Sequence, residues 1–574
     1  MLERRYIYLI LIGLCVLVYA NSLRGDFISD DLTSILRNPR MAQPLSYWHS
    51  PHDFLNSLCY NIAGLNTLPY HICSIIFHAV ASILAFIFLR LFFRELPSLF
   101  GAALFAVHPI HTEAVSWISG RTYVITAVFV FTTYLLYYRA TESKTLNRRL
   151  YLLSLLIFAY YINKQYSFYA FFPFMVILSD IVFARIQKNW KLWLPFLAIL
   201  ALRLIMAREA IQARLDMMIF ETAGVGQDRS VFIYFMYSFF VHLWLFLWPA
   251  KLRLYHGSVI MYHWSMWFGF VALSGIAGFL PVLFKKAKGV FFGLGIFALF
   301  LAPTYSPFLI AHLVAERYAY LPSIFFSILV SFLYEKYCLH FSGEKRVWVM
   351  LLSFVILASF AVRTVARNED WKSNERFWKV ELAVSPRSPD AHNNIAVMYL
   401  QEQNVVRAMR EFQKAIELNS NYYNAYNNLG LTYRDVGRKE EAITMLEKAI
   451  AINPRRPKAH YNLGLIYKDI WHVEAALGSF DKAIASDPRY IKAYDQRAAL
   501  YARTGKISEA LADYSKIIEI DPGFSSAHFH LARLYAKIGE YQRATKHYNK
   551  AAALGYAVDP EFLRQLEPNR DSIK

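Results

Sequence analysis

The chain has 574 residues, of which 56% are hydrophobic and 17% are aromatic. This composition is too apolar for an ordinary soluble protein and predicts a multi-pass membrane protein. The formal net charge of +19 does not indicate nucleic-acid binding, because Lys and Arg cluster between hydrophobic segments rather than on one face. The four cysteines have no C-x-x-C spacing, so the sequence implies neither a disulfide framework nor a zinc site.

The first apolar run, 6–20, follows Arg4 and Arg5 and is either a cleaved signal peptide or an uncleaved first span. We favour the uncleaved span. Ten further stretches of spanning length follow it, which makes eleven predicted spans in all. The ten are 69–89, 97–117, 121–138, 149–163, 166–184, 190–207, 264–284, 289–310, 321–335 and 346–363.

The basic residues between these stretches predict the orientation in the membrane. If the N-terminus is cytoplasmic, every basic cluster also falls on the cytoplasmic side, as the positive-inside rule requires. The clusters are Arg90/Arg94, Arg148/Arg149, Arg185/Lys188/Lys191, Lys285/Lys286/Lys288 and Lys345/Arg346. The apolar segment 231–248 does not fit, because a twelfth crossing would place the Lys285 cluster outside. We interpret this segment as a re-entrant or interfacial element of an outer loop.

Ionisable residues gather at the outer ends of the predicted spans. They are Asp30 and Asp31 after the first span, His108, His111 and Glu113 in the third, Arg121 opening the fourth, Lys164 ending the fifth, and Glu316 and Arg317 beginning the tenth. Such groups are costly at membrane depth, so their convergence predicts a polar cavity. Each group alone has a structural interpretation: a solvated loop or helix cap, an interfacial histidine, or a Glu316–Arg317 pair.

A polar cavity of this composition is suited to one kind of chemistry. A carboxylate acts as a general base toward an arriving hydroxyl, and Arg, Lys and His stabilise an anionic leaving group such as a phosphate. These groups are what glycosyl transfer from a lipid-phosphate sugar requires. The lipid tail of such a donor stays in the bilayer while its sugar faces outward.

The C-terminal part of the chain repeats every 34 residues. The pattern is similar to the tetratricopeptide repeat and indicates five repeats. It is seen at Tyr399, Tyr433, Tyr467, Tyr501 and Tyr535, at Ala408, Ala442, Ala476, Ala510 and Ala544, and at Pro454, Pro488 and Pro522. We therefore expect an all-α chain: a membrane helical bundle at 1–364, a capping helix and linker at 365–388, a repeat solenoid at 389–558 and a tail at 559–574.

One position of each repeat is expected to face the concave groove of the solenoid. It reads Asn394, Asn428, Asn462, Gln496 and His530. Because an amide both donates to and accepts from an extended backbone, the first four residues are candidates for binding an acceptor peptide, and the ladder resembles the solenoid of soluble O-GlcNAc transferases. The alternative, that Asn is simply common and solvated in this repeat, stays open.

Several motifs in order resemble the transmembrane and tetratricopeptide-repeat O-mannosyltransferase family. They are the run Asn21 to Asp31, the His-Pro-x-His-Thr-Glu-Ala-Val element at 108–115, Lys164, Ala315-Glu316-Arg317-Tyr318 with Leu321-Pro322-Ser323, and the repeats. The resemblance covers nearly the whole chain. It implies a GT-C fold with about eleven spans, and dolichyl- or undecaprenyl-phosphate mannose as the donor.

The resemblance also implies roles for individual residues. Asp30 is the expected general base, and Asp31 is expected to position the acceptor or a cation. The remaining outer residues, His108, His111, Glu113, Arg121, Lys164, Glu316 and Arg317, would line the pocket for donor phosphate and sugar. The family often has Lys-Glu where this chain has Lys164-Gln165, which leaves the sugar or acceptor preference open. A divalent metal is compatible with this class, and no other cofactor is implied.

The expected function is inverting transfer of a hexose, with mannose favoured, from a polyprenyl phosphate to Ser or Thr of a protein held by the repeats. Alternatives are transfer to a glycan or lipid, a polysaccharide polymerase or ligase, and a membrane-anchored scaffold without activity. One span suffices for an anchor, so eleven spans favour an enzyme.

The compartment is predicted from glycosylation sites. The chain has no N-x-Ser/Thr sequon. This favours a bacterial inner membrane with periplasmic repeats over an endoplasmic reticulum membrane with lumenal repeats.

Overall fold

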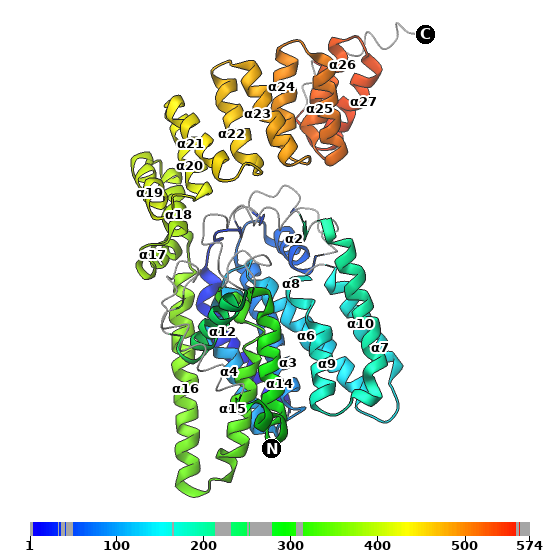
Figure 1. Ribbon diagram of the computed structural model, residues 1–574, viewed down its shortest axis with the longest axis vertical. Coiled ribbons are helices and arrows are strands. Elements are labelled where there is room, and N and C mark those ends of the chain that lie inside the picture. The colour runs from blue at the N-terminus through cyan, green and yellow to red at the C-terminus, as the bar shows by residue number, and fades with distance from the viewer. Residues whose placement is uncertain are drawn as a thin grey trace. The chain divides into compact units, whose positions relative to one another are not determined.

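A computed structural model of the chain describes residues 4–31, 34–35, 41, 50–163, 166–209, 211–212, 231–249, 252, 278–305, 314–557 and 562 (Figure 1). These residues are overwhelmingly helical, and no strand occurs among them. The chain divides into two compact units. The first runs to Arg387 and the second begins at Ser388. This agrees with the all-α fold class expected from the sequence.

The described residues of the first unit form a bundle of α-helices with several 3-10 turns. Its helices are α1 (Arg4–Tyr19), α2 (Pro51–Ala63), α3 (Leu68–Leu89), α4 (Glu95–Val107), α5 (Thr112–Ser116), α6 (Arg121–Thr141), α7 (Arg148–Ile162), α8 (Tyr166–Tyr169), α9 (Phe172–Val182), α10 (Ile186–Met206), α12 (Val231–Leu247), α14 (Lys288–Leu301), α15 (Ile324–Lys336), α16 (Gly343–Asp370) and α17 (Asn374–Val384). Its 3-10 turns are η1 (Ala20–Arg24), η4 (Pro109–His111), η5 (Ala302–Tyr305), η6 (Glu316–Ala319) and η7 (Cys338–His340). Residues 278–286 are also helical.

Many of these helices are apolar enough for a bilayer. Within the described ranges, five are also long enough to cross it: Arg4–Arg24, Leu68–Leu89, Arg121–Thr141, Ile186–Met206 and Gly343–Trp371. Four shorter apolar helices accompany them, at Glu95–Val107, Phe172–Val182, Ser238–Leu247 and Lys288–Thr304. The chain is a multi-pass membrane protein. The count of eleven spans stays a prediction, because most of 264–284 lies outside the described residues.

The predicted span 97–117 is wrong as a single helix. Helix α4 ends at Val107, and the chain then forms η4 and α5. The cause is local: Pro109 forces the preceding His108 out of the helical region, to φ −70° and ψ 126°. The predicted span 166–184 is likewise divided into α8 and α9. The break after Val107 matters because it moves the histidines and Glu113 out of α4 into a tight, polar turn.

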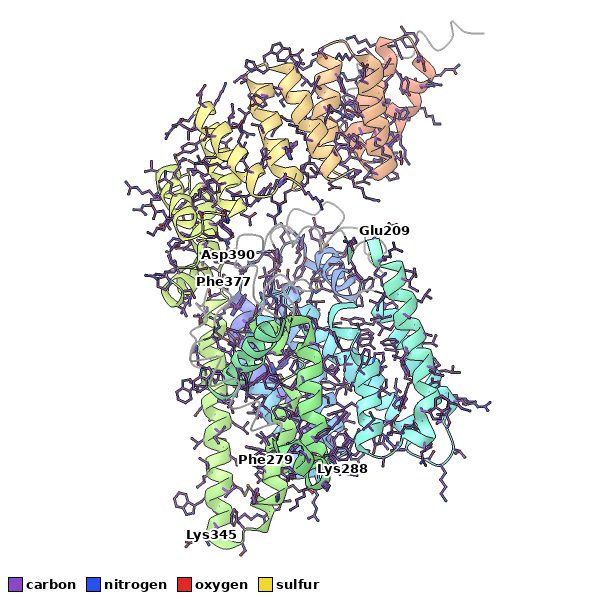
Figure 2. All side chains as sticks on the ribbon, in the orientation of Figure 1. Glu209, Phe279, Lys288, Lys345, Phe377 and Asp390 are labelled. Atoms are coloured by element: carbon purple, nitrogen blue, oxygen red, sulfur yellow. The ribbon has the colours of Figure 1, made fainter. Side chains whose placement is uncertain are left out.

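Labelled charged residues mark the two ends of the first unit. Lys288 and Lys345 lie at one end, and Glu209 lies at the other (Figure 2). At the lysine end, the backbone N–H of Arg94 donates to Glu335 at 2.8 Å. In the orientation predicted from the basic clusters, this end is cytoplasmic. We call the opposite end, where α1 ends and α3 and α6 begin, the outer end.

The core of the first unit is built from large apolar side chains of α1, α3, α4, α6, α9 and α14. Phe88, Phe131 and Tyr134 are fully buried, and the ring of Phe88 contacts the rings of both Phe131 and Tyr134. Helix α16 runs along the edge of the unit, and most of its side chains up to Val362 are exposed or half-buried (Figure 1). Its last turns are different, because Thr364, Arg367 and Asn368 are buried at the outer end.

The second unit consists of five helix pairs that match the five predicted repeats. They are α18 (Pro389–Gln401) with α19 (Val405–Leu418), α20 (Tyr423–Asp435) with α21 (Lys439–Ile452), α22 (Pro457–Asp469) with α23 (Val473–Ser486), α24 (Ile491–Arg503) with α25 (Ile507–Ile520), and α26 (Ser525–Lys537) with α27 (Tyr541–Ala553). The small residue where the two helices of each pair touch is fully buried in every repeat, from Ala408 to Ala544. A small side chain at this position is what lets the helix axes approach closely.

Candidate functional site

A buried ion pair joins two segments of the outer end that are 204 residues apart. Glu113, on α5, accepts from the guanidinium of Arg317, on η6, and its second oxygen accepts from the backbone N–H of Arg317 at 2.8 Å. The Glu113 side chain has no exposed surface, and that of Arg317 is 8% exposed. The guanidinium also lies over the ring of Trp117, 5.5 Å from its centroid. Both charges therefore have a partner.

A second buried ion pair connects η6 to the end of α16. The Nη2 atom of Arg367 lies 3.2 Å from Oε1 of Glu316, and its Nη1 atom lies 2.9 Å from Asp370. Burial raises the pKa of Glu316, and the charge of Arg367 opposes that shift. The other carboxylate oxygen of Glu316 is buried and has no hydrogen-bond partner among the described residues. This oxygen is therefore a buried hydrogen-bond acceptor that lacks a donor. We call Glu113, Glu316, Arg317 and Arg367 the charged cluster of the outer end.

The acidic pair after α1 is divided between surface and interior. Asp30 is exposed, whereas Asp31 is 1% exposed. Asp31 accepts from the backbone N–H of Ile28 at 3.1 Å and from both the backbone N–H and the hydroxyl of Ser119. Burial raises the pKa of Asp31 to about 7, against the effect of these hydrogen bonds. The hydrogen bonds of Asp31 therefore hold the loop at 25–31 against the turn between α5 and α6, whereas the Asp30 side chain is exposed at the surface.

The backbone of this loop is held in a defined path. Ser29 has φ 53°, a left-handed conformation that is uncommon for a residue other than glycine. Its N–H donates to Asn374 of α17 at 3.3 Å, and the N–H of Asp26 donates to the carbonyl of Lys372 at 2.9 Å. The ends of α16 and α17 thus fix the direction in which Asp30 leaves the loop.

Arg121 is a buried cation whose hydrogen-bond partners are neutral. Its guanidinium donates to the carbonyl of Tyr70, on α3, at 2.9 Å and to the side-chain oxygen of Asn56, on α2. The residue has no exposed surface, and its Nε atom has no partner within the described ranges. No carboxylate forms an ion pair with Arg121 among the described residues. Asp31 lies near enough to attract this charge electrostatically, without forming an ion pair with it. A buried cation that lacks an ion-pair partner is costly unless an anion binds beside it.

The predicted histidines have structural partners. The Nε2 atom of His108 lies 3.1 Å from the carbonyl of Phe246, and its Nδ1 atom accepts from the N–H of Ile110 at 3.2 Å. The Nε2 atom of His111 lies 2.8 Å from the hydroxyl of Ser323, and its Nδ1 atom has no partner in the described part of the chain. His108 is thus fully bonded within the protein, whereas His111 keeps one free nitrogen.

The structure brings most of the predicted site residues to the outer end. His108, His111 and Glu113 lie on η4, α5 and the turn before them, next to Glu316 and Arg317 on η6. Asp31 reaches Ser119, two residues before Arg121. The Glu316–Arg317 pair, considered above as a structural alternative, is replaced by ion pairs of each residue with a partner distant in sequence. Lys164 lies outside the described residues.

Sequence reasoning missed the contribution of α16. Asn368 accepts from the hydroxyl of Ser116 at 2.9 Å, and its side-chain N–H₂ donates to Asn21 and to the carbonyl of Val18 at 2.8 and 2.7 Å. It thereby joins α1, α5 and α16. The available signal was the group Arg363, Arg367, Asn368, Glu369 and Asp370, a polar run at the end of the last predicted span.

In the repeats, the donors of the amide ladder bond to neighbouring repeats. The Nδ2 atom of Asn428 donates to Asn393 at 3.0 Å, and that of Asn462 donates to Asn427 at 2.8 Å. Asn394 is different, because it bonds within its own helix, to the carbonyl of Asp390 at 2.8 Å.

The last two ladder positions also have partners within the array. Gln496 accepts from Lys468 at 2.6 Å, and His530 stacks on Tyr514 with ring centroids 5.0 Å apart. The ladder therefore stabilises the array, whatever else it binds.

The part of the chain that the structure describes contains no group of three or more His, Cys, Asp or Glu side chains able to hold a metal ion.

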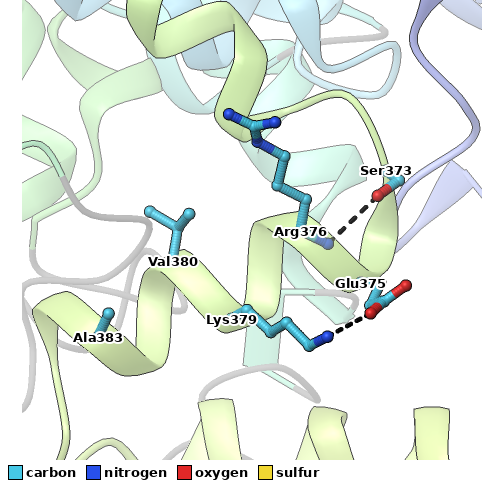
Figure 3. Close-up of a pocket in the computed structure, with 6 residues that line it drawn as sticks. All are labelled: Ser373, Glu375, Arg376, Lys379, Val380 and Ala383. Atoms are coloured by element: carbon cyan, nitrogen blue, oxygen red, sulfur yellow. Dashed lines mark hydrogen bonds and ion pairs between the residues drawn. The ribbon is translucent and has the colours of Figure 1, made fainter.

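A hollow of about 460 Å³ lies along α17, lined by Ser373, Glu375, Arg376, Lys379, Val380 and Ala383 (Figure 3). Ser373 caps the helix by accepting from the N–H of Arg376 at 3.2 Å, and Glu375 pairs with Lys379. None of these residues belongs to the charged cluster at the outer end.

The fold and this cluster define a class of protein: a multi-pass helical membrane protein that carries a tetratricopeptide-repeat array. Models of the tetratricopeptide repeat match residues 389–422, 411–444, 430–470, 491–524 and 514–546. Protein O-mannosyl-transferase TMTC3 of Homo sapiens is 26% identical over 71% of this chain and 50% of its own length. Protein O-mannosyl-transferase F38B6.6 of Caenorhabditis elegans is 26% identical over 72% of this chain and 63% of its own length.

The chain is therefore a homologue of the protein O-mannosyl-transferases, which confirms the resemblance drawn from its motifs. It spans about half to two thirds of the length of these relatives. Among solved structures, MamA is 28% identical with a TM-score of 0.27, covering 28% of this chain and 94% of its own. YrrB, a TPR protein with an unusual peptide-binding site, is 22% identical with a TM-score of 0.28, covering 33% of this chain and 97% of its own.

Proposed function

We propose that the chain is an inverting glycosyltransferase that moves a hexose, with mannose as the expected sugar, from a polyprenyl phosphate to Ser or Thr of a protein. The observation that carries the proposal is Arg121, a buried cation with neutral partners at the same end of the bundle as the exposed carboxylate of Asp30. A phosphate supplies the missing negative charge, and a carboxylate supplies the base. The names of the homologous relatives, protein O-mannosyl-transferases, support mannose as the sugar and a protein as the acceptor.

In the proposed reaction, Asp30 takes the proton from the acceptor hydroxyl as its oxygen attacks the anomeric carbon of the sugar. The bond between that carbon and the phosphate oxygen breaks, and polyprenyl phosphate leaves with the electron pair. Arg121 stabilises the negative charge that develops on the leaving phosphate. Because one displacement occurs, the configuration at the anomeric carbon inverts and no covalent enzyme intermediate forms.

The ion pairs of Glu113 and Glu316 have a different role in this proposal. Their charges are already compensated by Arg317 and Arg367, so they add little net charge for the donor phosphate. They hold η6, α5 and the end of α16 in fixed positions around the reacting groups. The unfilled oxygen of Glu316 and the free Nδ1 atom of His111 are the groups in this cluster available to sugar hydroxyls.

The repeats are proposed to hold the protein acceptor on the outer side of the membrane, in the periplasm of a bacterium or, alternatively, in the lumen of the endoplasmic reticulum. The amides of Asn394, Asn428 and Gln496 are half-buried, so each is partly accessible to a peptide. Asn462 is buried and bonded to the preceding repeat, so it contributes chiefly to the stability of the array.

The proposal is tested with the purified full-length chain, polyprenyl-phosphate mannose carrying a labelled sugar, and a protein acceptor. We expect transfer by the wild type, and a loss of roughly 10²-fold or more in Arg121→Gln because one preorganised cation is removed. Arg139→Gln is the matched control, since Arg139 lies at the other end of α6 in an exposed pair with Glu142. Equal transfer by wild type and Arg121→Gln would contradict the proposed role of the arginine.

The acceptor is tested separately with Asn394→Ala, whose amide bonds only within its own helix. We expect this variant to transfer less sugar to a protein acceptor and to retain transfer to a small hydroxyl acceptor. Equal loss with both acceptors contradicts peptide binding at this position. Failure of every polyprenyl-phosphate sugar as a donor would contradict the proposal and favour the membrane-anchored scaffold.

A further inference from the structure

Two cysteines at the outer end lie close together, although the sequence spacing gave no sign of it. Cys59 is on α2 and Cys73 is on α3, and their Sγ atoms are 3.6 Å apart. Cys59 is 2% exposed and packs in an apolar cluster with Phe27 and Tyr70. A disulfide bond is about 2.05 Å long, so the sulfurs need to approach by only about 1.5 Å. Changes of side-chain torsion angle cover a movement of this size.

The location of this pair favours oxidation. Cys59 lies between α1 and α3, and Cys73 lies in the second turn of α3, so both are at the outer end. Disulfides persist in the periplasm and in the lumen of the endoplasmic reticulum. The outer end is therefore oxidising in both compartments considered for this chain. The other two cysteines differ: Cys15 contacts Ser82 within the bundle, and Cys338 lies in η7, between α15 and α16, at the end predicted to be cytoplasmic.

The pair also stands next to Arg121. Asn56, which accepts from the Arg121 guanidinium, precedes Cys59 by three residues on α2. Tyr70, whose carbonyl accepts from the same guanidinium, precedes Cys73 by three residues on α3. Each cysteine is thus one helical turn from one of the two acceptors. A bond between the cysteines fixes the distance between those acceptors.

We propose that Cys59 and Cys73 form a disulfide that locks α2 against α3 around the guanidinium of Arg121. The reaction is thiol–disulfide exchange with a disulfide-containing oxidant of the outer compartment, either a protein or a small molecule. One cysteine thiolate attacks the oxidant and forms a mixed disulfide, and the other then displaces the oxidant's second sulfur. The S–S bond of the oxidant breaks, one S–S bond forms in the chain, and two electrons and two protons pass to the oxidant.

The bond itself is detected without reference to glycosyl transfer. The full-length chain is purified from membranes without reductant, denatured in the presence of N-ethylmaleimide, digested and analysed by mass spectrometry. We expect maleimide on Cys15 and Cys338 only, and a peptide pair joined through Cys59 and Cys73 that disappears on reduction. Maleimide on all four cysteines would overturn the proposal, as would a linkage of Cys59 to a second copy of the chain.

The positioning role is tested by comparing a reductant's effect on wild type and on Cys73→Ser. We expect reduction to lower the thermal unfolding midpoint of the wild type by several degrees and to leave that of Cys73→Ser unchanged. Cys338→Ser is the matched control and should respond to the reductant as the wild type does. If transfer activity is present, reduction should also weaken donor binding. The measurement of donor binding rests on the proposed function, whereas the mass spectrum and the unfolding midpoint do not.

Discussion

At the scale of single residues, the Glu113–Arg317 pair should dominate the stability of the outer end. Glu113→Gln leaves the Arg317 charge buried without its carboxylate, and we expect this to cost about 3–5 kcal/mol. The matched control is Glu142→Gln, which breaks an exposed pair with Arg139 and should cost about 1 kcal/mol or less. Thermal unfolding of the two variants in detergent checks the difference. Equal midpoints would show that the buried pair contributes little.

Asp31 predicts a dependence of stability on pH. Its pKa is about 7 in the folded chain, above the ordinary value of 3.8, because the carboxyl is buried. Between these values the folded chain keeps a proton that the unfolded chain has lost, so the contribution of protonated Asp31 is fully present below about pH 3.8 and is lost as the pH rises through 7. The unfolding midpoint of the wild type, relative to Asp31→Asn, should therefore fall from pH 5 to pH 7.5. A rising or constant difference contradicts this.

Residue types at the site were readable from the sequence, but their partners were not. The acidic pair, the histidines and Glu316-Arg317 stand out because charged residues are rare in apolar stretches. The sequence cannot show that Arg317 pairs with Glu113 rather than with its neighbour Glu316. That choice depends on how η6 packs against α5 and α16, which bring together residues 51 and 204 positions apart.

At the scale of elements, hydropathy located most helices but placed some of their ends wrongly. The run 97–117 was predicted as a single span, yet its helix stops at Val107 because Pro109 follows two residues later. The prediction of the repeats was more accurate, because a 34-residue period constrains every helix at once. All five predicted helix pairs are present. A repeated pattern carries more information than a single apolar run.

The close approach of the paired helices gives a prediction for the third repeat. A Cβ atom on Gly464, in α22, would lie 2.6 Å from the ring of Phe480, so Gly464→Ala should destabilise the array by about 1–3 kcal/mol. Gly478→Ala is the matched control, because its Cβ would meet nothing within 4 Å in α23. There alanine should stabilise the helix by about 0.5–1 kcal/mol. Hydrogen exchange of α22 and α23 in the full chain distinguishes the two effects, and equal protection would contradict the packing argument.

At the scale of the whole molecule, the orientation predicted from the basic clusters would place the repeats outside. Ser420, in the repeats, and Ser342, before α16, are both exposed and suit labelling after replacement by cysteine. We expect a membrane-impermeant maleimide to label Ser420→Cys in intact spheroplasts or sealed vesicles of native orientation, and Ser342→Cys only after permeabilisation. The reverse pattern would contradict the positive-inside assignment.

The central claim is that a carboxylate at the outer end of this bundle activates an acceptor hydroxyl for glycosyl transfer. The most direct test compares Asp30→Asn with Asp26→Asn, because both residues are exposed in the same loop after α1. With labelled polyprenyl-phosphate mannose and a protein acceptor, we predict that Asp30→Asn abolishes transfer while Asp26→Asn, equally stable, retains it. Undiminished transfer by Asp30→Asn would contradict the account.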